Sequence, residues 1–183
     1  MKKILYILII LVPILCYTQT GTKLAQEYEL KAAYLERFTR FIEWSPESDI
    51  YITSKPFLIT VLGDNPFGDI LNKMYSKQKI KDKKVIIKYI SNIDDLGKCH
   101  LLFIATSAKS QIIKTIKTIQ NKPIITVSQS PGMAEQGVMI NLFNEDNTIR
   151  YEINNKSIRN AGLKVSHLLL QKARIVDTPG DVK

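Results

Sequence analysis

Three short apolar segments constrain most strongly what this chain can fold into. They are residues 57–62 (FLITVL), 101–104 (LLFI) and 124–127 (IITV), and none of them alternates apolar with polar residues. A strand lacks this alternation when both faces of its sheet are covered, as in parallel sheets. Between the last two segments, isoleucines recur at helical spacing: Ile112, Ile113, Ile116 and Ile119. The order strand, helix, strand predicts a mostly parallel sheet with helices on both faces.

The N-terminal third of the chain predicts two helices. Residues 23–43 carry an apolar stripe at spacings of three, four and seven, so one long helix is expected to end near Trp44. After the strand at 57–62, Asn65 is the expected cap of a short helix, with Pro66 at its first position.

The remaining elements complete an α/β chain. Residues 85–90 form another strand, and residues 138–143 and 148–153 flank the turn sequence Asn-Glu-Asp-Asn, which predicts a hairpin. Two short helices follow, with Gly162 after the first and Ser166 as cap of the second. The predicted fold is therefore an α/β three-layer sandwich: a mostly parallel sheet with a C-terminal antiparallel hairpin and helices on both faces.

The first residues have the form of a secretory signal. A Met-Lys-Lys start precedes the apolar run 4–15, which is too short to span a bilayer. We expect a signal peptide at 1–18, one α/β domain at 19–176, a flexible tail at 177–183, and a periplasmic location. Lipidation of Cys16 is the alternative, but the leucine before it stands where lipoprotein signals need a small residue.

Charge and cysteine usage limit the possible partners. The net charge is +9, and loss of residues 1–18 leaves 24 basic and 17 acidic residues, or +7. The lysines are scattered without interleaved aromatic residues, which is typical of solvated faces, and the leader directs the chain away from nucleic acid. Without Cys16, the single Cys99 cannot form an intramolecular disulfide.

The common catalytic motifs are absent from the sequence. The chain lacks a nucleophile elbow, a phosphate-binding loop, a dinucleotide turn and a zinc-protease motif. Cys99 and His100 are adjacent at a strand start and so point to opposite faces, and His167 has no acidic company. We therefore predict no catalytic residue, no metal and no cofactor.

Two places are candidate contacts for a partner or ligand. One is the loop after the strand at 57–62, where backbone N–H groups at a strand end can receive a ligand; a simple capped turn is the alternative. The other is the strand 148–153, where a cross-strand or lateral ion pair is the alternative. The candidate residues are Gly63, Asp64, Asn65, Phe67, Arg150 and Glu152.

Seven blocks together resemble the YfiR-like family of periplasmic regulatory proteins. No single block is decisive, but they cover nearly all of the chain after the leader, in order. They are residues 30–44, 61–68, 99–104, 131–134, 139–142, 150–154 and 161–166.

The resemblance implies regulation rather than catalysis. The best-known members of this family inhibit the periplasmic region of an inner-membrane diguanylate cyclase, form homodimers, and are drawn away by an outer-membrane lipoprotein. Other relatives appear joined to sensor kinases, so a kinase is the other possible partner. The family's disulfide-based control is not expected with Cys99 alone. A periplasmic small-molecule-binding module and an unrecognised enzyme are the rival classes.

Overall fold

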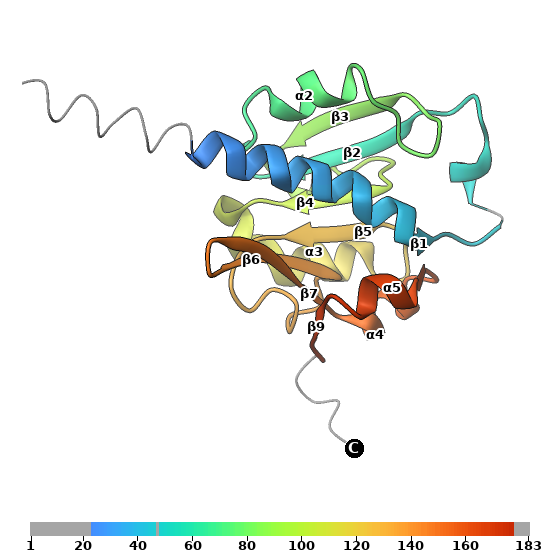
Figure 1. Cartoon of the computed structure of the whole chain (residues 1–183). Coiled ribbons are helices and arrows are strands. Elements are labelled where there is room, and N and C mark those ends of the chain that lie inside the picture. Colours follow the sequence, from blue (N-terminus) through green and yellow to red (C-terminus); the bar gives the residue numbers. More distant parts are fainter. Residues whose placement is uncertain (1–22, 47, 178–183) are drawn as a thin grey trace, which may run out of the picture.

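A seven-stranded sheet forms the middle layer of the protein, in the order β3-β2-β4-β5-β6-β7-β9 (Figure 1). The computed structural model describes residues 23–46 and 48–177. Neighbouring strands are parallel except β6 and β7, which are antiparallel, so the predicted sheet is confirmed. The strands are β2 (Phe57–Leu62), β3 (Val85–Ile90), β4 (Leu101–Ile104), β5 (Ile125–Ser128), β6 (Ile140–Glu145), β7 (Thr148–Ile153) and β9 (Arg174–Ile175).

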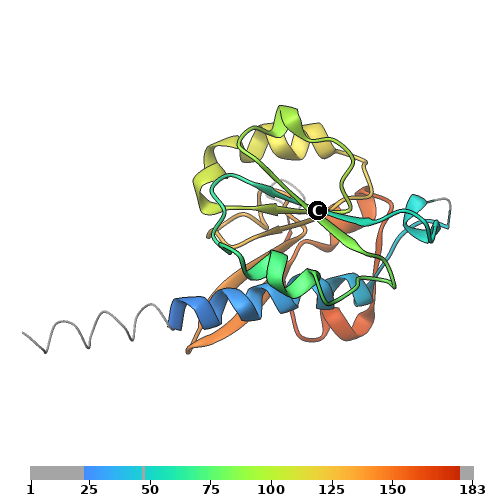
Figure 2. The same ribbon diagram turned by 90° about the horizontal axis from the view of Figure 1, so that it is seen from above.

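Helices cover both faces of the sheet, as expected for three layers (Figure 2). One face carries α1 (residues 23–41), α2 (Ile70–Tyr75) and α5 (His167–Leu170). The other carries the 3-10 helix η3 (Thr106–Gln111) and α3 (Ile112–Ile119). Three further short elements connect these layers: η1 (Asp49–Tyr51), η2 (Ile93–Asp95) and α4 (Asn155–Asn160).

The central strand β4 shows why the sequence lacks alternation. Leu101 and Phe103 belong to the core under α1, while Leu102 and Ile104 belong to the core under α3. All four side chains are buried. Both faces of this strand therefore need apolar residues.

The first helix ends two residues earlier than its apolar stripe predicts. Ile42 and Glu43 form strand β1, which pairs antiparallel with β8 (Lys164–Val165). This two-stranded ribbon holds the end of α1 against the segment before α5. The prediction of a helix through residue 43 was therefore wrong at its end, because a distant strand pairs with Ile42.

The turn after β2 also differs from its prediction. Asn65 accepts a hydrogen bond from the Phe67 N–H and donates its amide to the Gly68 carbonyl, so it closes a turn rather than capping a helix. Gly68 has a φ of +52°, a left-handed backbone conformation that does not fit a right-handed helix, and α2 begins after it at Ile70. The helix therefore starts about one turn later than expected.

The C-terminal hairpin is tighter than its four-residue turn sequence indicates. Asn144 and Glu145 pair within the hairpin, and only Asp146 and Asn147 form the turn, with φ values of 49° and 58°. Two central residues with positive φ define the turn type that matches strand twist. Further on, Ser166 accepts the Leu168 N–H and caps α5, as predicted.

The expected signal peptide and nearly all of the expected tail fall outside the residues that the structure describes. They comprise residues 1–18, with Cys16, and all of the tail but its first residue. Within residues 23–46 and 48–177, no helix is both long enough and apolar enough to cross a membrane.

Candidate functional site

The carboxyl ends of the parallel strands, where open α/β sheets usually hold ligands, are closed by α1. Tyr28 packs edge-on against Phe67, with ring centroids 5.4 Å apart. The Lys31 ammonium donates to Gln129 Oε1 at 2.7 Å. Phe67 is only 1% exposed and belongs to the core. This side chain is therefore not available to a ligand in the present conformation, although the sequence placed it in a crevice.

The backbone of the same loop is engaged by η3. The Asp64 N–H donates to Ser107 Oγ at 2.8 Å, so it is not free to receive an anion. Gly63 has a φ of +94°, and a Cβ added there would lie 2.7 Å from the same hydroxyl. Of the four candidate contacts in this loop, only Asp64 and Asn65 have exposed side chains. The two exposed side chains stay candidate partner contacts.

Arg150 and Glu152 lie on the face of the hairpin that α3 leaves uncovered. Arg150 Nε is 3.7 Å from Glu145 Oε2, and Arg174 NH1 on β9 is 3.5 Å from Glu152 Oε1. Arg174 also pairs with Glu145 at 2.8 Å and lies over the Phe143 ring, 4.4 Å from its centroid. The structure thus shows Arg150 and Glu152 in ion pairs, which was the alternative to a partner contact on this strand.

This set of residues, which we name the hairpin face, is suited to surface recognition rather than to chemistry. Its ion pairs are mostly exposed, and such pairs contribute only about 0–1 kcal/mol each. Exposed pairs exchange partners at little cost, whereas the 12% exposed carboxylate of Glu152 is held by Arg174 and by the Asn141 amide. Arg150 is therefore the more accessible of the two predicted contacts.

The pair Cys99 and His100 points to opposite faces, as the sequence predicts. The Cys99 side chain packs with the core under α3, and burial raises the pKa of its thiol to about 11. The His100 ring lies against Phe57 on the other face, with centroids 5.1 Å apart. These two residues do not form a catalytic dyad.

His100 has a partner that its sequence neighbours do not reveal. Its Nδ1 accepts the Leu58 N–H at 2.9 Å, so the ring proton lies on Nε2 and is donated to Asp49 Oδ1 at 3.1 Å. The hydrogen bond from His100 holds the pKa of Asp49 below its usual value, and Lys55 acts in the same direction. Both ring nitrogens are thus used to fasten η1 to the sheet, and neither is free to act as a base.

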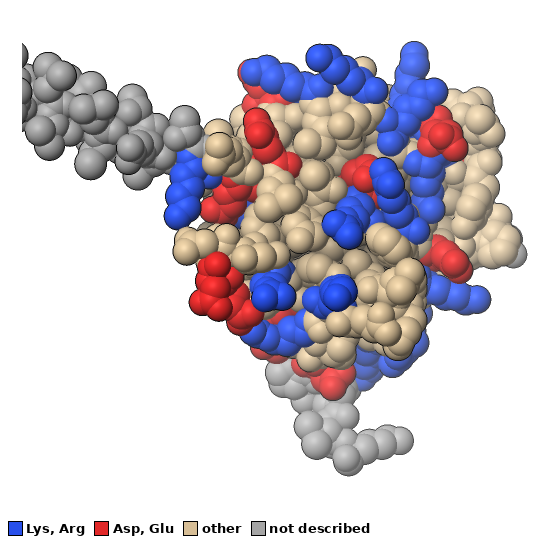
Figure 3. All heavy atoms as spheres, in the orientation of Figure 1, with Lys and Arg blue, Asp and Glu red and all other residues tan. Residues whose placement is uncertain are grey.

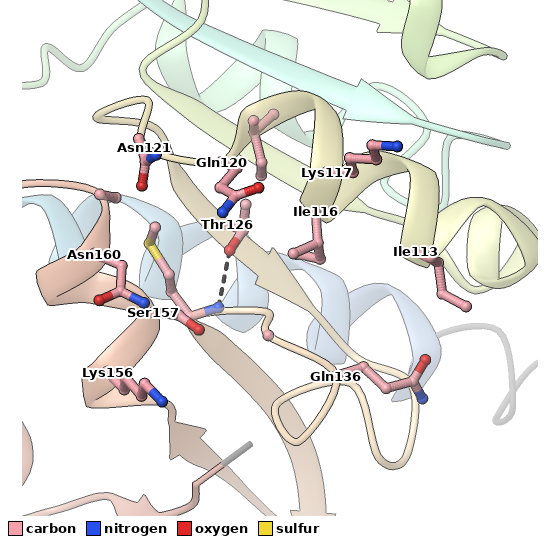
Figure 4. Close-up of a pocket in the computed structure, with 14 residues that line it drawn as sticks. Ile113, Ile116, Lys117, Gln120, Asn121, Thr126, Gln136, Lys156, Ser157 and Asn160 are labelled. Carbon is pink, nitrogen blue, oxygen red and sulfur yellow. Dashed lines mark hydrogen bonds between the residues drawn. The ribbon is translucent and has the colours of Figure 1, made fainter. Parts of the chain in front are cut away.

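A groove between α3 and α4 is a hollow that the sequence did not predict (Figure 4). Its volume is about 410 Å³, within the range of small-molecule sites. Its apolar part includes Ile116 and Met139, together with Ile113, which is 79% exposed. The Met139 N–H is tied to Thr126 Oγ1 at 2.8 Å, which fixes one wall.

The polar groups of this groove are amides, hydroxyls and two ammonium groups. The lining residues of this kind are Lys117, Gln120, Asn121, Thr126, Gln136, Lys156, Ser157 and Asn160. The lining contains neither a carboxylate nor a histidine. The groove therefore suits a neutral or anionic ligand, and its lining has no carboxylate or imidazole to act as a general base. The spacing of isoleucines on α3 only weakly indicated this groove, because its opposite wall comes from α4, which is distant in the sequence.

The described residues also contain no group of three or more His, Cys, Asp or Glu side chains that could hold a metal ion. The fold and these surfaces define a three-layer α/β domain whose exposed features are suited to binding.

The chain belongs to the YfiR/HmsC-like family, whose model matches residues 28–174. No curated protein sequence gives a match.

Two solved structures are similar to this chain. A conserved domain protein of Vibrio cholerae is 11% identical, with a TM-score of 0.48, over 64% of this chain and 54% of its own. The ABC domain in complex with L-Trp from Streptococcus pneumoniae is 10% identical, with a TM-score of 0.53, over 77% of this chain and 61% of its own. The chain thus spans little more than half the length of these two proteins, and the second likeness shows a shared fold alone.

Proposed function

We propose that this protein is a periplasmic regulator that binds the periplasmic region of an inner-membrane signalling protein, a diguanylate cyclase or a sensor kinase, and holds it inactive. The observation that carries the proposal is membership of the YfiR/HmsC-like family over residues 28–174. The exposed ion pairs of the hairpin face agree with a binding role.

The proposal includes a homodimer and release by an outer-membrane lipoprotein, as in the family that the chain resembles. The basic net charge of the chain favours an acidic face on the signalling protein. Cys99 is the free cysteine of the described residues and offers no intramolecular disulfide within them. Control by oxidation of this chain is therefore not part of the proposal.

Direct binding tests this function. The purified protein is titrated against the periplasmic regions of the cyclases and kinases of its host, and the rates are followed by surface plasmon resonance. Charge steering predicts that raising salt from 50 to about 300 mM slows association more than it accelerates dissociation. Absence of binding to every such region would reject the regulatory proposal.

A second candidate function is small-molecule binding, and the groove between α3 and α4 is the observation that favours it. A ligand that binds only the folded state raises the melting temperature, by an amount that grows with the logarithm of the ligand concentration once this exceeds the Kd. A thermal-shift panel of amino acids and nucleotides tests this, with Ile116→Lys as the variant that fills the groove. A shift that this substitution does not reduce would place the ligand elsewhere.

A further inference from the structure

Strand β3 is an open edge of the sheet. It pairs with β2 on one side, and no strand of the described part pairs with its other side. The carbonyls of Lys84 and Ile90 accept hydrogen bonds from Phe57 and Gly63 beside β2. Because alternate residues of a strand direct their backbone groups to opposite sides, the N–H and C=O groups of the alternating positions 85, 87 and 89 face the open edge.

The charge around this edge is strongly positive. Residues 69–90 contain seven lysines and two aspartates, a net charge of +5 out of +9 for the whole chain. Figure 3 shows basic side chains gathered over α2, β3 and the segment between them. Positive charge is thus concentrated beside the backbone N–H and C=O groups at the open edge of β3.

Apolar side chains are exposed at the same edge. Ile86 is 53% exposed, and it lines a cavity of about 550 Å³ with Pro56, Lys79 and Lys84. Tyr89 is also exposed on the same strand. An isolated exposed apolar residue needs no explanation, but two on one unpaired strand provide side-chain contacts for an added strand.

The floor of this cavity is fixed by a buried lysine. The Lys83 ammonium donates to the Ile52 carbonyl and, at 3.1 Å, to the Lys55 carbonyl. Lys81 and Asp82 form a tight turn with φ values of 49° and 61°, so Lys83 returns to pair with Ile80. The start of β3 is therefore held in place before any partner arrives, which lowers the ordering cost of binding.

We propose that β3 accepts an extended acidic segment of another protein as an eighth strand. Backbone hydrogen bonds to positions 85, 87 and 89 provide the pairing, and the surrounding lysines select glutamate and aspartate side chains. A second copy of this chain is disfavoured, because two lysine-rich edges would repel each other. Lysines protect edge strands from self-association in this way, and the same charge admits an acidic partner.

The proposal concerns how the domain docks, and it goes beyond the identity of the signalling partner. A peptide experiment therefore separates it from the proposed function. The probe is an eight-residue, acetylated and amidated peptide in which four glutamates alternate with threonine and valine. Its controls are the peptide with lysine in place of glutamate and the acidic peptide with N-methyl groups at its four central residues.

Amide hydrogen exchange in the purified protein reads the pairing directly. With the acidic peptide bound, the amides of Val85, Ile87 and Tyr89 should exchange at least about tenfold more slowly, while those of Ile86 and Lys88, already bonded toward β2, should not change. By fluorescence anisotropy, the N-methylated peptide should bind at least about tenfold more weakly. Both comparisons use the unmodified protein, so misfolding of a variant cannot explain their results.

Protein variants test the charge. Lys79→Gln with Lys84→Gln should weaken the acidic peptide about three- to tenfold, whereas the matched pair Lys109→Gln with Lys122→Gln, also exposed, should not. Equal binding of the N-methylated peptide, or no protection of the three amides, would overturn the proposal. So would binding to anionic phosphatidylglycerol vesicles without binding of the peptide, which would assign the lysines to a membrane surface.

Discussion

Replacement of His100 by alanine should destabilise the protein by about 3 kcal/mol. The largest part is the Leu58 N–H, which would lose its acceptor at the edge of the core, at a cost of about 1–3 kcal/mol. Loss of the ring contact with Phe57 adds about 0.5–1.5 kcal/mol. The bond to Asp49 adds less than about 1 kcal/mol, because that carboxylate is 35% exposed and screened by solvent.

Urea unfolding followed by circular dichroism at pH 7 measures this change in the free energy of unfolding. In a thermal melt, the same change should lower the melting temperature by about 6–12 °C. His100→Asn places an amide oxygen where Nδ1 lies and should recover about half of the loss. His167→Ala, at an exposed histidine on α5, is the matched control and should change stability by less than about 0.5 kcal/mol. A loss below about 1 kcal/mol for His100→Ala, or no recovery with asparagine, would refute the assigned role of Nδ1.

Three further predictions concern the core, the thiol and acid. Phe38→Ala should cost about 3–5 kcal/mol by urea unfolding, because this ring is fully buried between Tyr34 and Tyr151; a cost below about 1 kcal/mol would contradict its position. The Cys99 thiol, with its pKa raised to about 11, should react with Ellman's reagent at pH 7 at least about a hundredfold more slowly than free cysteine until the protein unfolds; fast reaction in the native state would disprove this. The lowered pKa of Asp49 means that its carboxylate stabilises the fold above the unfolded-state pKa of about 4, and that this contribution disappears as pH falls through the folded-state pKa. Asp49→Asn should therefore lower stability at pH 7 and weaken its decline below about pH 4, and an unchanged acid profile would count against the pair.

Local sequence patterns predicted most of the fold because they matched the long-range structure. Strand β4 is apolar on both faces, and its residues divide between the two cores as the absence of alternation requires. Errors arose where a distant segment overrode a local preference. Ile42 continues the helical stripe of α1 but pairs with Val165, and no spacing within residues 23–43 carries that information.

The candidate sites were less predictable than the fold. The turn at Asn65 has the residues of a helix cap, yet its side chain bonds within the turn, and α1 packs over Phe67. The His100–Asp49 bond joins residues 51 positions apart, and the groove needs α3 and α4 side by side. Such contacts depend on tertiary packing, which a single sequence without its structure does not specify.

Output of the signalling pathway in a deletion strain tests the central claim most directly. The gene is deleted in its host, cyclic di-GMP is measured by mass spectrometry, and phosphorylation of the response regulators is followed in parallel. An inhibitor of a cyclase or kinase predicts a severalfold rise in one of these outputs, restored to its starting level by a plasmid copy of the gene. Unchanged cyclic di-GMP and unchanged phosphorylation in the deletion strain would contradict the regulatory function.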